Sequence, residues 1–262
     1  MKFAGIIAEY DPFHNGHAWQ LAQAKALGAE RVAVAMSCSL VQRGALPLLP
    51  EAVRTRSALT CGADLVFALP APCACAGAEA FARAGVALLA AAGCDGLVFG
   101  AETPDAALLM EAAELLDSGS YRAALKAQLA GGARSFAAAR QAAAAQLASD
   151  ERVAALLDKP NNNLSVEYCR AIRSLAPRME AYPLPRQGAN HGEALHSAHG
   201  QFASASALRK LWAEGGADAV APYVPEAVFP LYQEAYAAGQ YTDFSAAGRC
   251  ELALLRSACR GK

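Results

Sequence analysis

Residues 3–17 read Phe-Ala-Gly-Ile-Ile-Ala-Glu-Tyr-Asp-Pro-Phe-His-Asn-Gly-His, and the rest of the chain is organised around this stretch. Its apolar start, residues 3–8, predicts a buried parallel strand. Pro12 then keeps Asp11 out of helical geometry, and residues 18–27 predict a helix. His14 and His17 therefore lie in a turn between a first strand and a first helix.

This turn has the chemistry of an anion site. The free amides and the positive dipole end of a helix start attract anions, and Gly16 has no Cβ to keep a phosphate or ribose away from the backbone. His14 and His17 can both donate to phosphate oxygens during phosphoryl transfer. A structural histidine is the alternative for either one alone. Zinc is a weaker interpretation, because the two supply at most two ligands and no nearby Cys or His completes a set.

Short apolar runs and intervening helical segments continue down the chain. Strands are predicted at 31–36, 65–69 and 97–99, with helices at 50–61 and 77–92. This alternation predicts an α/β fold, a Rossmann-like parallel sheet with right-handed crossovers. Ligands of such sheets bind beyond the carboxyl ends of the strands, where the His14 loop, an Arg43 loop and Gly100 all fall. A surface role is the alternative for Arg43.

The later chain divides by composition. Residues at about 104–158 are alanine-rich and predict three or so inserted helices. A further strand is expected at 179–182, closed by Pro183. We expect a nucleotidyltransferase-like domain over 1–215 and a C-terminal helical segment over 216–262.

Composition excludes some classes of protein. The 262 residues carry a net charge of -1, so bulk electrostatics does not hold nucleic acid. The eight cysteines form no Cys-x-x-Cys and predict reduced core residues of a cytoplasmic protein. Neither a signal peptide nor an apolar run of about twenty residues is recognised, so no membrane span is expected.

Three later clusters are candidates for ligand contacts. Asn161 and Asn162 either cap a helix or read an adenine edge or a ribose. Ser206 and Arg209 share one face at a helix start and can form a second phosphate clamp, although capping explains the serine as well. A loop of the ligand-binding kind, Pro185 to His191, follows the last strand and contains Arg186. His191, His196 and His199 lie in this loop and its continuation and are expected to be exposed.

The motifs together resemble a known family. His14-Asn-Gly-His17 and Ser204-Ala-Ser206-Ala-Leu-Arg209 are similar to the two signatures of the HxGH nucleotidyltransferase superfamily. A longer ordered set resembles the tRNA(Met) cytidine acetate ligase family over nearly the whole chain: Glu9 to His17, Val41-Gln-Arg-Gly44, Gly62-Ala-Asp-Leu-Val66, Pro160-Asn-Asn162, Glu167-Tyr168 and Arg186-Gln-Gly-Ala189.

The resemblance implies an ATP-dependent ligase. Members join acetate to ATP, form acetyl-adenylate and release pyrophosphate, and then acetylate N4 of the wobble cytidine of elongator tRNA(Met). Mg²⁺ is expected with the nucleotide. The catalytic residues implied are His14, His17 and Arg209. The ATP site implied includes the stretch Ile7 to Gln20, within it Ile7, Asn15, Gly16 and Gln20, and also Gly100, Asn161, Asn162, Arg186 and Ser206.

The sequence also departs from that family. Asp11 stands where asparagine is usual, Ser37-Cys-Ser-Leu40 replaces Ser-Gly-Asn-Phe, and Asn163 and Ser165 replace Ile and Gly. The sequence ends soon after Cys259, where members continue into a helical region expected to help hold the tRNA.

Other functions therefore stay open. One is a short nucleotidyltransferase that activates another small acid or phosphate ester without tRNA. Another is an ATP-binding regulatory module, which would not need His14, His17 and Arg209 together. Binding to tRNA requires a local basic surface, unless these charges are only solvated helix faces; the candidates are Arg122, Lys126, Arg134, Arg140, Arg170, Arg173 and Lys210.

Overall fold

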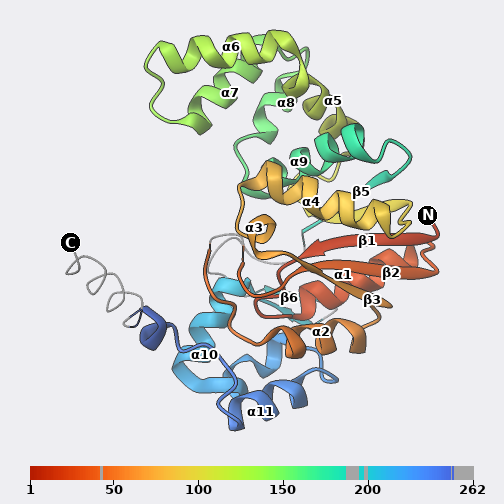
Figure 1. Ribbon diagram of the computed structural model, residues 1–262, viewed down its shortest axis with the longest axis vertical. Helices are drawn as coiled ribbons and strands as arrows, with labels where there is room; N and C mark the ends of the chain where they lie inside the picture. The colour runs from red at the N-terminus through yellow and green to blue at the C-terminus, as the bar shows by residue number, and fades with distance from the viewer. Residues whose placement is uncertain (42–43, 187–194, 198–199, 249, 251–262) are drawn as a thin grey trace.

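The computed structural model describes residues 1–41, 44–186, 195–197, 200–248 and 250. Its main sheet has five parallel strands in the order β3-β2-β1-β4-β5 (Figure 1). These strands are β1 (Phe3–Ala8), β2 (Arg31–Ser37), β3 (Leu65–Leu69), β4 (Gly96–Ala101) and β5 (Glu180–Pro185). The order reverses between β1 and β4, and such a switch point opens a crevice at the carboxyl ends of the strands. The predicted α/β fold is confirmed.

Helices cover both faces of the sheet (Figure 1). Successive side chains of a strand point to opposite faces, so Ile6 packs with one helix layer and Ile7 with the other. The Ile6 side is covered by α1 (Asn15–Ala26), α2 (Glu51–Thr60), α10 (Ala205–Val220) and α11 (Phe229–Ala237). The Ile7 side is covered by α4 (Ala78–Ala91) and α9 (Pro160–Leu175).

The alanine-rich segment lies beyond α4 and α9, at the end of the molecule opposite α11 (Figure 1). It contains four helices rather than about three, and no strand occurs in it among the described residues. They are α5 (Ala106–Asp117), α6 (Gly119–Ala130), α7 (Phe136–Leu147) and α8 (Glu151–Leu156). Short elements complete the fold: α3 (Ala71–Ala74), the antiparallel pair β6 (Leu195–Ser197) and β7 (Gly200–Phe202), and the 3₁₀ helix η1 (Ala221–Tyr223).

Two predicted boundaries were wrong. The first helix begins at Asn15 rather than at residue 18, because the His14 side chain caps it. Strand β5 does not close at Pro183 but pairs with β4 through Pro185. It is an edge strand, which needs backbone hydrogen bonds along one side only and so tolerates proline.

Helix α10 is broken at Gly216, where φ is 68°. A Cβ there would lie 2.5 Å from the Tyr236 ring, so the position requires glycine for conformation and for space. The break falls beside the predicted boundary between 215 and 216; the domain division itself stays a prediction. In the part of the chain described, no helix is long and apolar enough to cross a membrane.

Some predicted residues lie outside the described ones. These are Arg43, His191 and His199. His196 belongs to β6 by its backbone.

Candidate functional site

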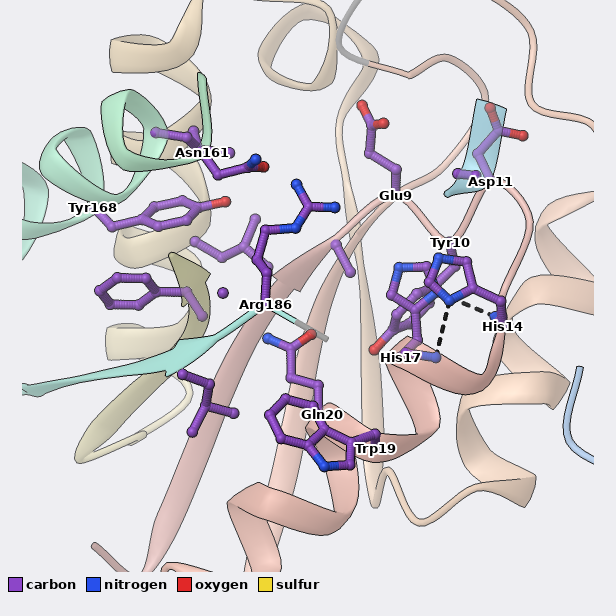
Figure 2. Close-up of a pocket in the computed structure, with 18 of the residues that line it drawn as sticks. Glu9, Tyr10, Asp11, His14, His17, Trp19, Gln20, Asn161, Tyr168 and Arg186 are labelled. Carbon is purple, nitrogen blue, oxygen red and sulfur yellow. Dashed lines mark hydrogen bonds between the residues drawn. The ribbon is translucent and has the colours of Figure 1, made fainter. Parts of the chain in front are cut away.

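A pocket of about 350 Å³ opens where β1 and β4 end (Figure 2). The starts of α1 and α9 and the end of β5 complete its walls. Most of the residues predicted for the nucleotide site line it: Ile7, His14, Gly16, His17, Gln20, Gly100, Asn161 and Arg186. Asn15, Asn162, Ser206 and Arg209 do not line it. The structure thus brings together segments far apart in the sequence and leaves part of the predicted set outside.

The histidine turn is held by its own backbone. The amide of Gly16 donates to Nδ1 of His14 at 3.0 Å, and the amide of His14 donates to Nδ1 of His17 at 3.2 Å. This reciprocal pair is a capping box built from two imidazoles. The two rings stack with their centroids 3.8 Å apart. The turn therefore has a fixed shape without any ligand.

These contacts also set the protonation of both rings. Because each Nδ1 accepts a hydrogen bond, the proton of the neutral ring is on Nε2. Burial, and then the charge of Arg186, lowers the pKa of His14 to about 3. Burial, followed by His14 and Arg186, also lowers the pKa of His17 well below its usual value. The pocket wall thus carries two neutral N–H donors.

Gly16 serves the turn itself. A Cβ there would lie 2.9 Å from Cε1 of His14, closer than side chains pack. We expected glycine to admit a phosphate to the backbone. The structure gives a second reason for glycine at this position: any larger residue would displace the His14 ring that caps the helix.

Arg186 and Gln20 stand in the same pocket. Figure 2 shows the Arg186 side chain between Tyr168 and the two histidines. The Arg186 amide donates to Ala101 O at 3.3 Å, and a Cβ at Gly100 would lie 3.4 Å from Arg186 Cγ. Nε2 of Gln20 donates to Val98 O at 3.0 Å. Arg186 thus supplies the positive charge of this wall.

The asparagines at the start of α9 have separate roles. A carboxylate from the end of β4, Glu102, accepts from the amides of Asn161 at 3.2 Å and Asn162 at 2.6 Å. It also accepts from the Asn161 side chain at 2.6 Å. The buried Asn162 side chain is bonded to the backbone and hydroxyl of Thr103. Asn162 therefore fixes α9 to β4, whereas Asn161 lines the pocket.

The second predicted clamp is not assembled. Nη1 of Arg209 donates to the backbone oxygen of Asp11 at 2.6 Å and to its Oδ2 at 3.0 Å. The Ser206 hydroxyl is exposed and lies 3.1 Å from Oγ of Ser204, which caps α10. The remaining predicted residue outside the pocket, Asn15, donates to Pro222 O at 3.3 Å. The Asp11 carboxylate thus occupies the Arg209 guanidinium.

Other residues that line the pocket had no role of their own in the sequence prediction. Tyr10 adopts φ 51° and packs edge-on against His17, with ring centroids 4.8 Å apart. Burial, and then Glu9, raises the pKa of Tyr168. Glu9 and Tyr168 belong to the quoted motifs, so the motifs already held the signal. Ala8, Asp11 and Trp19 also line the pocket and lie within the implied stretch Ile7 to Gln20. The lining residues that sequence reasoning missed are Phe81, Phe99, Leu164, Leu184, Pro185 and Ala205.

A buried arginine supports the pocket floor. Arg54 of α2 is fully buried. Its Nη1 donates to Glu9 O and Ser37 O, each at 2.7 Å, and Nε donates to Leu49 O at 3.0 Å. Nη2 donates to Cys38 O. One side chain therefore ties the ends of β1 and β2 to the start of α2.

The described residues do not form a ready-made metal centre. No group of three or more His, Cys, Asp or Glu side chains among them could hold a metal ion. Mg²⁺ in nucleotide sites is commonly held by one or two carboxylates together with the phosphates. Glu9 and Asp11 both line the pocket. The buried Asp11 carboxylate already accepts from the Leu48 amide and from Arg209, so Glu9 is the carboxylate that fits this role.

Comparison with known proteins places this geometry in context. The model of the family described as HIGH Nucleotidyl Transferase matches residues 1–257. The chain is 41% identical to the tRNA(Met) cytidine acetate ligase of Syntrophotalea carbinolica, over 82% of this chain and 52% of that protein. It is 35% identical to the protein of the same name from Caldanaerobacter subterraneus subsp. tengcongensis, over 92% of this chain and 60% of that protein.

A solved structure of a related protein has a similar fold. The crystal structure of Thermotoga maritima TmcAL bound with alpha-thio ATP has a TM-score of 0.82 and 30% identity. The match covers 92% of this chain and 57% of that one. The chain spans about half the length of the relatives that it matches.

Proposed function

Because this chain belongs to the HIGH Nucleotidyl Transferase family, we propose that it is an ATP-dependent enzyme that acetylates tRNA. It binds ATP in the pocket at the β1–β4 switch point and activates acetate as acetyl-adenylate. It then transfers the acetyl group to N4 of the wobble cytidine of elongator tRNA(Met). The names of its relatives support this substrate pair. A cytoplasmic location is part of the proposal.

The observation that carries the proposal is the preorganised pair of neutral imidazoles at the start of α1. In the first step an acetate oxygen attacks the α-phosphorus, the bond to the bridging oxygen breaks and pyrophosphate leaves. Negative charge builds on the departing phosphates. N–H donors fixed before the reaction stabilise that charge without reorganisation.

The positive charge of Arg186 assists the same step. Arg186 lines the pocket beside the histidines and attracts the triphosphate. The dipole of α1 adds partial positive charge at its start. Mg²⁺, when bound with the nucleotide, would neutralise phosphate charge, and Glu9 is the pocket carboxylate that would hold it.

The second step needs no further cofactor. The N4 amine of cytidine attacks the acetyl carbon, the acyl–phosphate bond breaks and AMP leaves with one proton lost from nitrogen. The pocket therefore has to admit a base from outside after pyrophosphate has left.

Exchange of radiolabelled pyrophosphate into ATP tests the first step. Exchange that requires acetate, and that does not require tRNA, is expected. Formate, propionate and phosphate esters serve as competing acids. Exchange with none of these would remove the adenylation step.

A second function is favoured by the net charge of -1. In this alternative the same pocket activates another small acid or a phosphate ester, and no tRNA takes part. Mass spectrometry of elongator tRNA(Met) from cells lacking the protein separates the two functions. Loss of N4-acetylcytidine supports the acetate–tRNA ligase, and its retention favours the alternative.

A further inference from the structure

Helices α6 and α7 form a hairpin of one charge sign. Residues 118–148 contain four basic residues, Arg122, Lys126, Arg134 and Arg140, and no Asp or Glu. The whole chain has 23 basic and 24 acidic residues, so this segment concentrates positive charge. Figure 1 shows it at the end of the molecule opposite α11.

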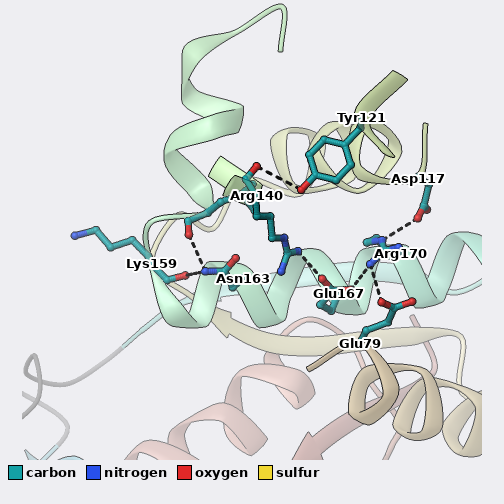
Figure 3. Close-up of polar contacts among 9 residues, drawn as sticks. Glu79, Asp117, Tyr121, Arg140, Lys159, Asn163, Glu167 and Arg170 are labelled. Atoms are coloured by element: carbon teal, nitrogen blue, oxygen red, sulfur yellow. Dashed lines mark hydrogen bonds and ion pairs between the residues drawn. The ribbon is translucent and has the colours of Figure 1, made fainter. Parts of the chain in front are cut away.

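The structure separates the basic residues that the sequence offered for tRNA. Arg140 and Arg170 both pair with the buried Glu167, at 2.5 and 2.7 Å. Arg170 also contacts Asp117 (Figure 3). Arg173 pairs with Glu114. The guanidiniums of Arg140 and Arg170 therefore neutralise the buried Glu167, and Arg173 belongs to an exposed ion pair. All three are already paired with carboxylates, so they are weaker candidates for RNA than unpaired cations.

The other basic residues of the hairpin are free of such pairs. Arg122, Lys126 and Arg134 are exposed, and none forms an ion pair within the described part of the chain. Arg122 and Lys126 are four residues apart on α6, so they share one helix face. Their charges therefore point at solvent.

An aromatic ring lies beside these charges. Phe136, the first residue of α7, has 61% of its surface exposed, the largest fraction among the exposed large apolar residues described. Together with Arg122 it lines a second depression of about 560 Å³, between α4, α6, α7 and α9. Three carboxylates that pair with Arg140 and Arg170 also line the depression: Glu79, Asp117 and Glu167. An exposed ring beside the Arg122 cation, which is unpaired among the described residues, favours a nucleic acid over an apolar protein partner, because bases stack on such rings while phosphates pair with cations.

The hairpin is also held rigidly relative to the candidate site. Glu167 of α9 binds Arg140 of α7, and the Tyr121 hydroxyl donates to Arg140 O at 3.4 Å (Figure 3). The same helix α9 begins at the nucleotide pocket, which Asn161 lines. A molecule seated on the hairpin is thus placed relative to the reacting group through α9.

We propose that Arg122, Lys126, Arg134 and Phe136, hereafter the hairpin face, bind the acceptor RNA. The three cations lie along its phosphate backbone and Phe136 stacks on an unpaired base. This inference rests on the proposed function and adds to it where the tRNA is held. Phosphate contacts position RNA without reading its sequence, so other parts of the protein select tRNA(Met).

The test is a filter-binding titration with the complete 262-residue chain. Parent, Arg122→Ala/Arg134→Ala and Arg178→Ala proteins are titrated with elongator tRNA(Met) and with an unrelated tRNA, at low and moderate salt. Arg178 is the matched control, an exposed arginine outside the hairpin without an ion pair among the described residues. We expect the double variant to bind both tRNAs more weakly, by about the same factor. The slope of log K against log salt concentration should fall by about one for each contact removed.

The ring has its own pair of variants. Phe136→Leu keeps apolar surface and Phe136→Tyr keeps a ring. Stacking predicts that the first loses RNA affinity by on the order of tenfold, since a stacked base is worth about 1–3 kcal/mol, and that the second retains it.

Acetate-dependent pyrophosphate exchange is measured on every variant and should be unchanged. Parent-like tRNA binding by the double variant overturns the hairpin face while leaving the proposed function intact. Tighter binding of polyglutamate than of RNA at equal charge would assign the face to an acidic protein instead. If the parent protein binds no tRNA at low salt, tRNA is not the acceptor and the role of the hairpin face is also rejected. If the parent binds tRNA but shows no pyrophosphate exchange, only the adenylation step is rejected.

Discussion

The starts of helices α1 and α10 were both predicted to bind phosphate, and they differ in how far they are organised. At α1 the donors and acceptors lie within four residues, and the capping box sets both imidazoles without a ligand. At α10 the guanidinium of Arg209 is bonded to Asp11, 198 residues away, and Ser206 faces solvent.

The two helix starts differ in which contacts hold their side chains in place. A four-residue turn closes at small entropic cost and is stabilised by its own backbone hydrogen bonds. The position of Arg209 depends on a partner from another part of the fold. A carboxylate is a strong partner for it, and a phosphate has to compete with that carboxylate.

The largest test of this contrast is His17→Ala. It removes a preformed donor, and transition-state donors contribute a few kcal/mol, so we expect pyrophosphate exchange to fall by on the order of a hundredfold. Loss of the cap should lower stability by only about 1 kcal/mol, so the variant stays folded during the assay. His17→Asn is the companion variant, because an amide oxygen can still accept from the His14 amide. Unaltered exchange in His17→Ala would sink the assignment of α1.

Arg209 tests the less organised helix start. Arg209→Ala should reduce ATP turnover by roughly tenfold, through loss of one charge-assisted contact, and Arg209→Lys should also be poor because an ammonium lacks the bidentate fork. Asp11→Asn sharpens the comparison, since it removes the competing charge and should lower the KM for ATP. If Arg209→Ala turns over ATP like the parent, the start of α10 is structural.

The pH dependence of stability tests the histidine turn in a third way. The pKa of His14 is about 3 in the folded protein, against about 6.5 unfolded, so between these values the unfolded chain binds more protons. The free energy of unfolding should therefore fall as pH drops below 6.5, by at most about 1.4 kcal/mol per pH unit for this group. Urea titrations at pH 7, 6 and 5 measure it. His14→Asn, which can still cap the helix, should flatten the dependence; equal slopes would contradict the assigned burial.

The smallest expected effect concerns Glu102, a long-range contact that is already formed. Glu102→Ala removes the acceptor for the Asn161 and Asn162 amides and should cost about 1 kcal/mol of stability. Glu102→Gln keeps one oxygen and should cost less. Thermal melting measures both. A raised KM for ATP in Glu102→Ala would show that the α9 wall needs this contact to shape the pocket.

Features of the site could be predicted from the sequence where the contacts that fix them are local in sequence. Residues 3–17 were enough to place the first strand and the histidine turn, because their determinants are local. Asn162 and Arg209 match motifs, but their partners Thr103 and Asp11 come from other segments. Those contacts are set by the assembled fold and not by the motif.

The burial of charged side chains in ion pairs was the second feature that could not be predicted from the sequence. Arg140 and Arg170 read as exposed cations, yet Glu167 takes both. Glu167 was quoted only as part of a motif. Arg170 lies three residues after Glu167 on α9, a spacing that favours an ion pair. Nothing near Glu167 in the sequence indicates that Arg140 of α7 would pair with it as well.

Arg54 has a consequence for how this protein can diverge. Its guanidinium meets backbone oxygens of Glu9, Ser37 and Leu49, which lie in three separate segments. Substitution of side chains at those positions leaves the carbonyls in place, whereas an inserted or deleted residue would displace them. We therefore expect homologous sequences that keep this arginine to vary freely in residue type near these positions and to keep the chain lengths between them, so that alignment gaps gather elsewhere.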